Sequence, residues 1–243
     1  GAGGSGGSRS MIAASGAIIE CAETIVDNGK KLAGHVLEAA VEDIEFADGV
    51  FTVAGTDRNI GIMTLAEKAR ELGGTGDLPD DLSHKVNHNT APISFPNGCH
   101  VAEVEIDPDT GVIGIDRYTV VDDFGVVVNP MIVEGQVHGG IAQGIGQVLA
   151  EDTIYDEDGQ LVTGTFLDYQ LPRADDIAHI EFTTHAVPCK TNPLGVKGCG
   201  EAGNGGSYPV IYNAIMDALN GNGGKELGIP ATPQRIWQAL QGN

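Results

Sequence analysis

Apolar residues recur along the first part of the chain with the spacing of a helix. Positions 11, 18 and 25 are apolar, as are positions 12, 19 and 26, so both series repeat every seven residues. Asn28-Gly29 is a typical signal for the end of such a helix. In order, the patterns of the first part predict a helix at 10–28, a short helix at 31–40, two strands joined by a turn at 48–49, and a helix at 64–72 opened by a capping box.

The second part of the chain follows a segment, residues 73–97, that is rich in Gly, Asp, Asn and Pro and is typical of a connector. The patterns after it predict, in order, a hairpin of strands 99–106 and 112–121, a helix from Asn129-Pro130 to about 149, a hairpin turning at 156–159, a helix at 208–219 and a short helix from 232. We therefore expect an α+β fold of two mixed sub-units, about residues 1–95 and 96–243, packed around a shared crevice.

Composition narrows the classes of partner. Thirteen Lys and Arg against 34 Asp and Glu give a net charge of -21, which repels nucleic acid and anionic membrane surfaces. The sequence has no run of about 20 apolar residues and no basic-then-apolar leader, so we expect neither a membrane span nor secretion. The four cysteines form no C-x-x-C pair, which favours reduced thiols and a cytoplasmic protein.

The N-terminal run GAGGSGGSRS fits several templates. Its glycines match the dinucleotide fingerprint G-x-G-x-x-G, and Ser5 sits in the nucleophile pattern G-x-S-x-G, but both templates need a preceding strand that is absent here. A flexible Gly/Ser tail is a third interpretation. Arg9 stands directly before the first predicted helix, where loop N–H groups, the helix N-terminus and a guanidinium together suit a phosphate. We favour the phosphate site.

The predicted helix from Asn129 carries five glycines, which is costly because each is about 1 kcal/mol worse than alanine in a helix. Something must therefore approach its backbone closely. One interpretation is tight packing on another helix with glutamines at the rim. The other is a face, with Gln136, Gln143 and Gln147 beside Gly140, that hydrogen-bonds a flat, heteroatom-rich ligand.

Glu201 stands nearly alone among charges in the glycine-rich run GVKGCGEAGNGG. A glutamate among glycines is often a turn residue in water. Placed in a partly desolvated pocket, it would instead suit a general base, although nearby Lys197 would oppose a raised pKa. His84 and His88 are four residues apart but lie in a segment with loop composition, so we expect no metal site there.

Taken together, these motifs resemble the molybdenum-binding subunit of the xanthine dehydrogenase, aldehyde oxidase and aerobic carbon monoxide dehydrogenase family, in its C-terminal half. The resemblance covers essentially the whole chain. It is carried by GGSGGSRS before a helix, VVNPMIVEGQVHGGIAQGIGQ, NPLGVKGCGEAG and ATPQRIWQAL. The second and third motifs are long and specific.

The resemblance implies a cofactor and a set of site residues. The cofactor is molybdenum bound to molybdopterin, in bacterial members usually as the cytosine dinucleotide. The run GGSRS matches the loop that contacts the pyrophosphate, Gln136 matches a glutamine that hydrogen-bonds the pterin, and Glu201 matches the base that takes a proton from molybdenum-bound hydroxide. The cofactor-binding residues implied in this way are Gly7, Ser8, Arg9, Ser10, Gln136 and Gly200, with no protein ligand to the metal.

The resemblance also implies partners, because the family's subunit is about three times as long as this chain. The missing N-terminal half carries part of the molybdenum pocket, and iron–sulfur clusters and FAD are expected on other subunits. We therefore expect an oxidoreductase component that hydroxylates an aldehyde or an N-heterocycle, or oxidises carbon monoxide, and that cannot turn over alone. The alternatives are a catalytically silent assembly module and, less favoured, a serine hydrolase acting through Ser5.

Overall fold

The computed structural model describes residues 4, 6–74, 76, 78–89, 94–177, 179–220 and 227–242. The chain divides into two compact units, a larger one of residues 1–10 and 92–243 and a smaller one of residues 11–91. Each unit has its own cluster of buried apolar side chains. The glycine-rich N-terminal run thus belongs to the larger unit, although it lies far from that unit's other residues in sequence.

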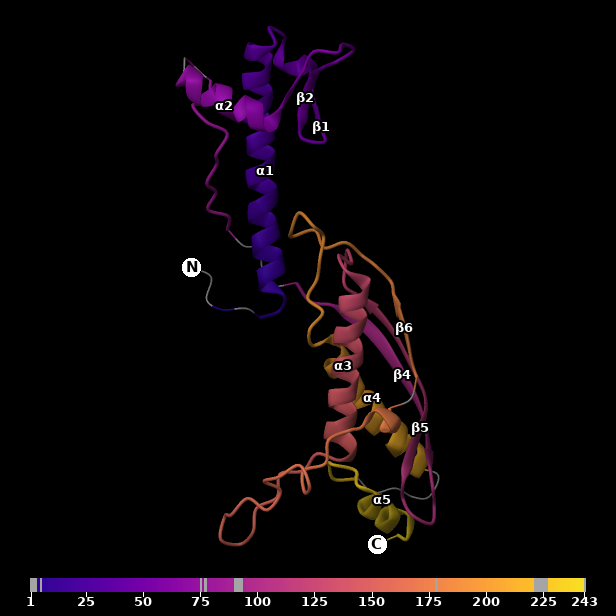
Figure 1. The fold of residues 1–243 in the computed structure, drawn as a ribbon. Coiled ribbons are helices and arrows are strands. Elements are labelled where there is room, and N and C mark those ends of the chain that lie inside the picture. Colours follow the sequence, from indigo (N-terminus) through magenta and orange to yellow (C-terminus); the bar gives the residue numbers. More distant parts are fainter. Residues whose placement is uncertain are drawn as a thin grey trace. The chain divides into compact units, whose positions relative to one another are not determined.

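The smaller unit contains most of one long helix, one small sheet and one short helix (Figure 1). Its elements are α1 (Arg9–Val36, whose first two residues belong to the larger unit), the 3-10 turn Val41–Asp43, strands β1 (Ile44–Ala47), β2 (Val50–Val53) and β3 (Asn59–Gly61), and helix α2 (Ile62–Leu72). The three strands pair antiparallel in sequence order. The predicted turn at 48–49 is therefore confirmed as the β1–β2 connection.

Three of the sequence expectations for this unit were wrong. The helix does not stop at Asn28-Gly29, because α1 continues unbroken to Val36. The short helix predicted at 31–40 is therefore not a separate element, since residues 31–36 are the end of α1. Gly29 is buried in α1 where the ring of Phe51 lies against it, and a Cβ there would overlap the ring. The glycine therefore provides space for packing. Helix α2 begins at Ile62 with Gly61 as N-cap, so the predicted capping box at 64–67 lies inside the helix.

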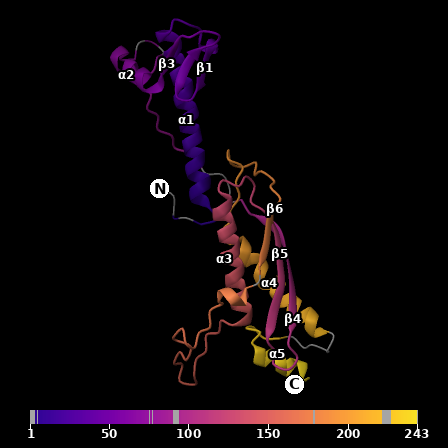
Figure 2. The ribbon, with the colours of Figure 1, turned by 45° about the vertical axis from the view of Figure 1, so that its right-hand side comes forward.

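The larger unit is built on a three-stranded sheet covered by helices (Figure 2). Strands β4 (Asn97–Ile106) and β5 (Ile113–Asp123) form the predicted hairpin, and β6 (Ile180–Thr184) pairs parallel with β5. Helices α3 (Pro130–Leu149) and α4 (Ala202–Asn220) pack against each other, and α4 contacts β4. The 3-10 turn Ala174–Asp176 precedes β6, and α5 (Pro233–Leu240) is the last helix.

Helix caps in this unit follow the sequence signals. The Asn129 side chain caps α3 by accepting a hydrogen bond from the N–H of Ile132 at 3.1 Å, with Pro130 at the first helical position. The Thr232 hydroxyl caps α5 by accepting from the N–H of Arg235 at 3.4 Å. The predicted positions of both helix starts are confirmed, and the α+β class is confirmed with them.

Two other expectations for the larger unit were wrong. The predicted hairpin at 156–159 is a turn closed by an isolated bridge between Tyr155 and Leu161, with no flanking strands. Helix α4 begins at Ala202, so the glycine-rich run after Glu201 is helical and Pro209 lies inside the helix. The physical reason is contact with α3: a Cβ on Gly203 would overlap the α3 backbone, so these glycines let two helices approach closely.

Candidate functional site

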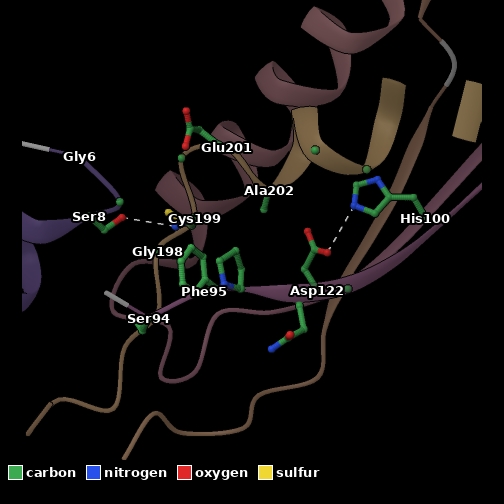
Figure 3. Close-up of a pocket in the computed structure, with 17 residues that line it drawn as sticks. Gly6, Ser8, Ser94, Phe95, His100, Asp122, Gly198, Cys199, Glu201 and Ala202 are labelled. Carbon is green, nitrogen blue, oxygen red and sulfur yellow. Dashed lines mark hydrogen bonds and ion pairs between the residues drawn. The ribbon is translucent and has the colours of Figure 1, made fainter. Parts of the chain in front are cut away.

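A cavity of about 690 Å³ lies in the larger unit (Figure 3). Its wall comes from segments 6–8, 94–98 and 198–202, with His100, Asp122 and two glycines of α4. These segments are the end of the N-terminal loop, the entry to β4, and the loop before α4. A cavity of this size lies within the range of small-molecule and cofactor sites.

The first and third of these segments meet directly. The N–H of Cys199 donates to Oγ of Ser8 at 3.4 Å, across 191 positions of sequence. A Cβ on Gly198 would lie 3.2 Å from the carbonyl oxygen of Gly7. Gly7 and Ser8 both have a left-handed backbone, with φ of 56° and 57°, and α1 begins at the next residue, Arg9. Gly7 and Ser8 thus form a turn that contacts the Cys199 loop and directly precedes the first residue of α1.

Glu201 lies at the rim of this cavity, directly before α4, and its side chain is exposed. The partly desolvated carboxylate expected from the sequence is therefore not what this chain alone provides. The ammonium of Lys197 forms an ion pair with Asp123, with Nζ and Oδ2 2.5 Å apart. Cys199, two residues before Glu201, is half-buried, and burial raises the pKa of its thiol against the opposing effect of its hydrogen bond with Ser8.

Asp123 fixes the loop that leads to Glu201. Its Oδ1 accepts from the N–H groups of Gly125 at 2.8 Å and Val187 at 3.0 Å, and its Oδ2 accepts from Lys197. The N–H of Lys197 also donates to the carbonyl of Phe124 at 2.8 Å. Burial alone would raise the pKa of Asp123, but these hydrogen bonds outweigh it and hold the pKa at about 2.

The depressed pKa of Asp123 predicts a pH dependence of folding stability. Since the folded-state pKa of about 2 lies below the usual aspartate pKa of 3.8, the carboxylate stabilises the fold fully above pH 3.8 and loses this effect as the pH falls through 2. We expect the unfolding free-energy difference between wild type and Asp123→Asn to be large at pH 6 and to shrink towards pH 2. Urea unfolding at a series of pH values measures it, and a difference that stays constant with pH would contradict the assignment.

Packing against another helix accounts for some of the glycines of helix α3 but not for all of them. Gly140 and Gly144 are buried where α4 lies against α3, so packing explains them. A Cβ at Gly135 or Gly139 would instead meet nothing within 4 Å. Gln136 is exposed, and its Oε1 lies 3.7 Å from the position of a Cβ on Gly200. The structure therefore brings Gln136 next to the loop that carries Glu201, although it is not one of the residues that line the cavity.

A buried polar group that the sequence reasoning missed forms part of the cavity wall. Asp122, on β5, is 2% exposed, and its Oδ1 lies 3.4 Å from Nε2 of His100 on β4. Nδ1 of the same ring is 2.7 Å from the hydroxyl of Tyr118, which is fully buried. Burial raises the pKa of Tyr118 above its usual range, and the charge of Asp122 raises it further. Tyr118 is thus a neutral hydrogen-bond donor.

A signal for Asp122 was present in the sequence. Tyr118, Val120 and Asp122 alternate along β5 and all three are buried. A carboxylate at a position where the period of two predicts an inward side chain is unusual, because burying a charge is costly without a partner. His100 carries no comparable signal, since its partnership with Asp122 depends on the pairing of two strands.

The structure also describes most of the other residues that the sequence analysis singled out. Ser5, the proposed hydrolase nucleophile, lies outside the described residues. The four cysteines are free thiols. Nδ1 of His88 lies 2.8 Å from a carboxylate oxygen of Glu20. Within the described part of the chain, no group of three His, Cys, Asp or Glu is placed to hold a metal ion, and no helix is long and apolar enough to cross a membrane.

Comparison with known proteins defines the class to which this fold and cavity belong. Residues 1–178 match the profile of the molybdopterin cofactor-binding domain, which is most of the chain, so the chain belongs to that family. The matched range includes the N-terminal loop, His100, Asp122 and Gln136. It ends before Glu201, which is covered instead by the similarity to individual proteins.

The chain is similar to parts of several molybdenum hydroxylase large subunits, which confirms the resemblance drawn from its motifs. It is 37% identical to subunit gamma of the 6-hydroxypseudooxynicotine dehydrogenase complex of Paenarthrobacter nicotinovorans, over 98% of this chain and 30% of that protein. The crystal structure of quinoline 2-oxidoreductase from Pseudomonas putida 86 superposes with a TM-score of 0.84 at 36% identity, over 96% of this chain and 30% of that one. The crystal structure of the Cu,Mo-CO dehydrogenase superposes with a TM-score of 0.86 at 30% identity, over 98% of this chain and 30% of that one.

These proteins are oxidoreductases, and this chain spans about 30% of the length of each. The first of them is named as one subunit of a complex. In each of these comparisons, the chain therefore aligns with one part of a longer protein.

Proposed function

We propose that this chain is the part of a molybdenum hydroxylase that binds a molybdopterin dinucleotide in the cavity next to the N-terminal loop and supplies Glu201 as the base. One observation carries the proposal. The cavity brings Gly7 and Ser8 together with Gly200 and Glu201, residues that lie about 190 positions apart in sequence and were assigned to one cofactor from their motifs alone.

The residues present fit such a cofactor. Much of the cavity wall is backbone, because seven of its lining residues are glycines: Gly6, Gly7, Gly98, Gly198, Gly200, Gly205 and Gly206. Bare backbone lets a large planar ligand approach closely and offers N–H groups. Ser8 lies directly before the first residue of α1, where an anion such as a phosphate is favoured. Gln136, next to Gly200, adds an amide that can donate and accept hydrogen bonds.

The bound molybdenum cofactor supplies two-electron oxidation of the substrate carbon. The part of this chain in the reaction is to hold the cofactor through Gly7, Ser8, Arg9 and Ser10 and through Gln136 and Gly200. Glu201 accepts a proton at its exposed carboxylate, which is available for this because Lys197 is held by Asp123. A positioned carboxylate of this kind contributes about 10²- to 10⁴-fold to a rate.

The remainder of the enzyme comes from outside this chain. We propose that an N-terminal part of the molybdenum subunit completes the pocket, and that an iron–sulfur subunit and an FAD subunit carry the electrons away. The substrate class is an aldehyde, an N-heterocycle or carbon monoxide, the last two in keeping with the names of quinoline 2-oxidoreductase and CO dehydrogenase. We propose the cytosine dinucleotide as the form of the cofactor and the cytoplasm as its location.

Arg9→Ala tests the dinucleotide assignment. In the complete complex we expect this variant to retain less nucleotide than wild type, because a guanidinium at the entrance of α1 would be lost beside the phosphates. Cytidine monophosphate released by acid, measured per mole of complex, gives the result. Arg58→Ala, which removes an exposed arginine of the smaller unit, is the matched control and should leave the nucleotide unchanged. Equal nucleotide in Arg9→Ala and wild type would refute the role of Arg9.

A further inference from the structure

One oxygen of Asp122 has no partner in the described structure. Asp122 lines the cavity and is 2% exposed, and while Oδ1 faces His100, Oδ2 is buried without a hydrogen-bond partner (Figure 3). Buried polar atoms are nearly always hydrogen-bonded, and a buried anionic oxygen is among the most costly to leave unmatched. The hydrogen-bond donor that this oxygen lacks is therefore expected on the ligand that occupies the cavity.

The three side chains behind this oxygen form a directed chain of hydrogen bonds. The Tyr118 hydroxyl, kept protonated by its buried surroundings, donates to Nδ1 of His100. Since Nδ1 accepts this hydrogen bond, the N–H of the ring is on Nε2, which lies 3.4 Å from Oδ1 of Asp122. In this arrangement every donor has an acceptor, and Oδ2 is the acceptor left over. The chain of hydrogen bonds fixes the orientation of the carboxylate, and with it the position of Oδ2 in the residue that lines the cavity.

The side chains of Asp122 and His100 fit in place only because two neighbouring residues are glycines. A Cβ on Gly98 would overlap Asp122, and a Cβ on Gly206 would come within 2.5 Å of the ring of His100. Both glycines line the same cavity. The pair is therefore packed between β4 and α4 at the cavity wall.

The charge of the wall indicates what kind of group Oδ2 accepts from. Asp122 and Glu201 are acidic, and no lysine or arginine is among the described residues that line the cavity. A phosphate near Asp122 would be repelled, whereas a neutral or cationic N–H donor would be attracted. Phosphate is better placed at Ser8 and the start of α1, so a single ligand with an anionic part and an amino-bearing ring meets both requirements.

We propose that Oδ2 of Asp122 accepts a hydrogen bond from the exocyclic amino group of a pyrimidine-type ring of the cofactor, and that His100 is the positioning residue that orients the carboxylate. This inference rests on the proposed function. Such an amino group is present in both the pterin and the cytosine of the dinucleotide. A neutral amino donor matched to a charged, oriented acceptor makes this a strong hydrogen bond.

The experiment measures binding of two small probes to the complete complex, purified from cells that cannot make the cofactor. Calorimetric titration with cytidine monophosphate and with 6-hydroxymethylpterin compares wild type with Asp122→Asn, in which an amide N–H₂ can replace the accepting oxygen. We expect the probe that reaches Asp122 to bind about 10- to 100-fold more weakly to the variant. Asp116→Asn, an exposed change on the same strand, is the matched control and should bind both probes as wild type does.

The affected probe identifies the ring. A weaker cytidine monophosphate interaction assigns Asp122 to the nucleotide base, and a weaker pterin interaction assigns it to the pterin. If Asp122→Asn does not fold, the same wild-type complex is titrated with uridine monophosphate and with the 2-oxo analogue of the pterin. Loss of the amino group should then weaken binding by a similar factor for the probe that contacts Asp122.

Two results would overturn the account at different levels. Probes that bind wild type and Asp122→Asn equally, or that bind wild type equally with and without the amino group, would refute the role of Asp122 and leave the proposed function standing. Failure of both probes to bind the wild-type complex would instead refute the cofactor site itself.

Discussion

Glu201→Gln is expected to lower turnover of the complete complex by about 10²- to 10⁴-fold while molybdenum stays bound. The substitution keeps the size and hydrogen-bonding reach of the side chain but removes its ability to accept a proton. Because Glu201 is exposed at the cavity rim and its neighbour Lys197 is tied to Asp123, the change should leave the fold intact. Turnover is measured with a panel of N-heterocycles, aldehydes and carbon monoxide on which the wild-type complex has first been shown to act.

The matched control for this prediction is Glu157→Gln. Glu157 is an exposed glutamate of the same unit that does not line the cavity, so its loss should not change the rate. Molybdenum content measured beside the rate separates loss of chemistry from loss of cofactor. A Glu201→Gln complex with full molybdenum and wild-type turnover would remove the catalytic role of this residue.

Gly203→Ala is expected to destabilise the larger unit by about 1–3 kcal/mol or more. Gly203 is the second residue of α4, and a Cβ there would overlap the carbonyl of Val137 and lie 3.0 Å from the N atom of Ile141. These are backbone atoms of α3 and cannot rotate away, so the two helices would have to separate. Denaturant unfolding of the chain, followed by circular dichroism, measures the loss.

Gly139→Ala provides the opposite case within α3 itself. A Cβ at this position would meet nothing within 4 Å, so the change should stabilise the helix by about 1 kcal/mol through its better propensity. The two substitutions add the same methyl group and are predicted to act with opposite signs. If Gly203→Ala were as stable as wild type, α4 would not lie against α3 in the way described.

The sequence predicted those elements of the fold that are specified by local signals. The β4–β5 hairpin has alternating residues and a DPDTG turn, and α3 and α5 have a capping residue followed by proline, so all three were placed correctly. Gly29 and the glycines after Glu201 were misinterpreted as a stop and a loop. A glycine that ends a helix and one that lets a ring or a second helix approach look the same in one sequence, because the difference lies in a distant partner.

The candidate site, like the fold, could be predicted from the sequence only in part. Its predicted residues were assigned by motif, and the structure brings Gly7, Ser8, Gly200 and Glu201 to one cavity, although their roles stay predictions. The exposure of Glu201 could not be foreseen, because no local pattern in the sequence reports how far a loop side chain is covered by other elements. His100 and Asp122 were missed because strand pairing brings them together. Their chemistry depends on register, which no local spacing in the sequence encodes.

The central claim is that this chain holds a molybdopterin dinucleotide, and metal and nucleotide content tests it most directly. The measurement is elemental analysis for molybdenum, with assay of acid-released cytidine monophosphate, on the chain recovered in its complete complex. The account predicts both at close to one mole per mole of chain. An intact, folded complex that contains neither would contradict it, and the chain would then be a scaffold that keeps the motifs of the family without its cofactor.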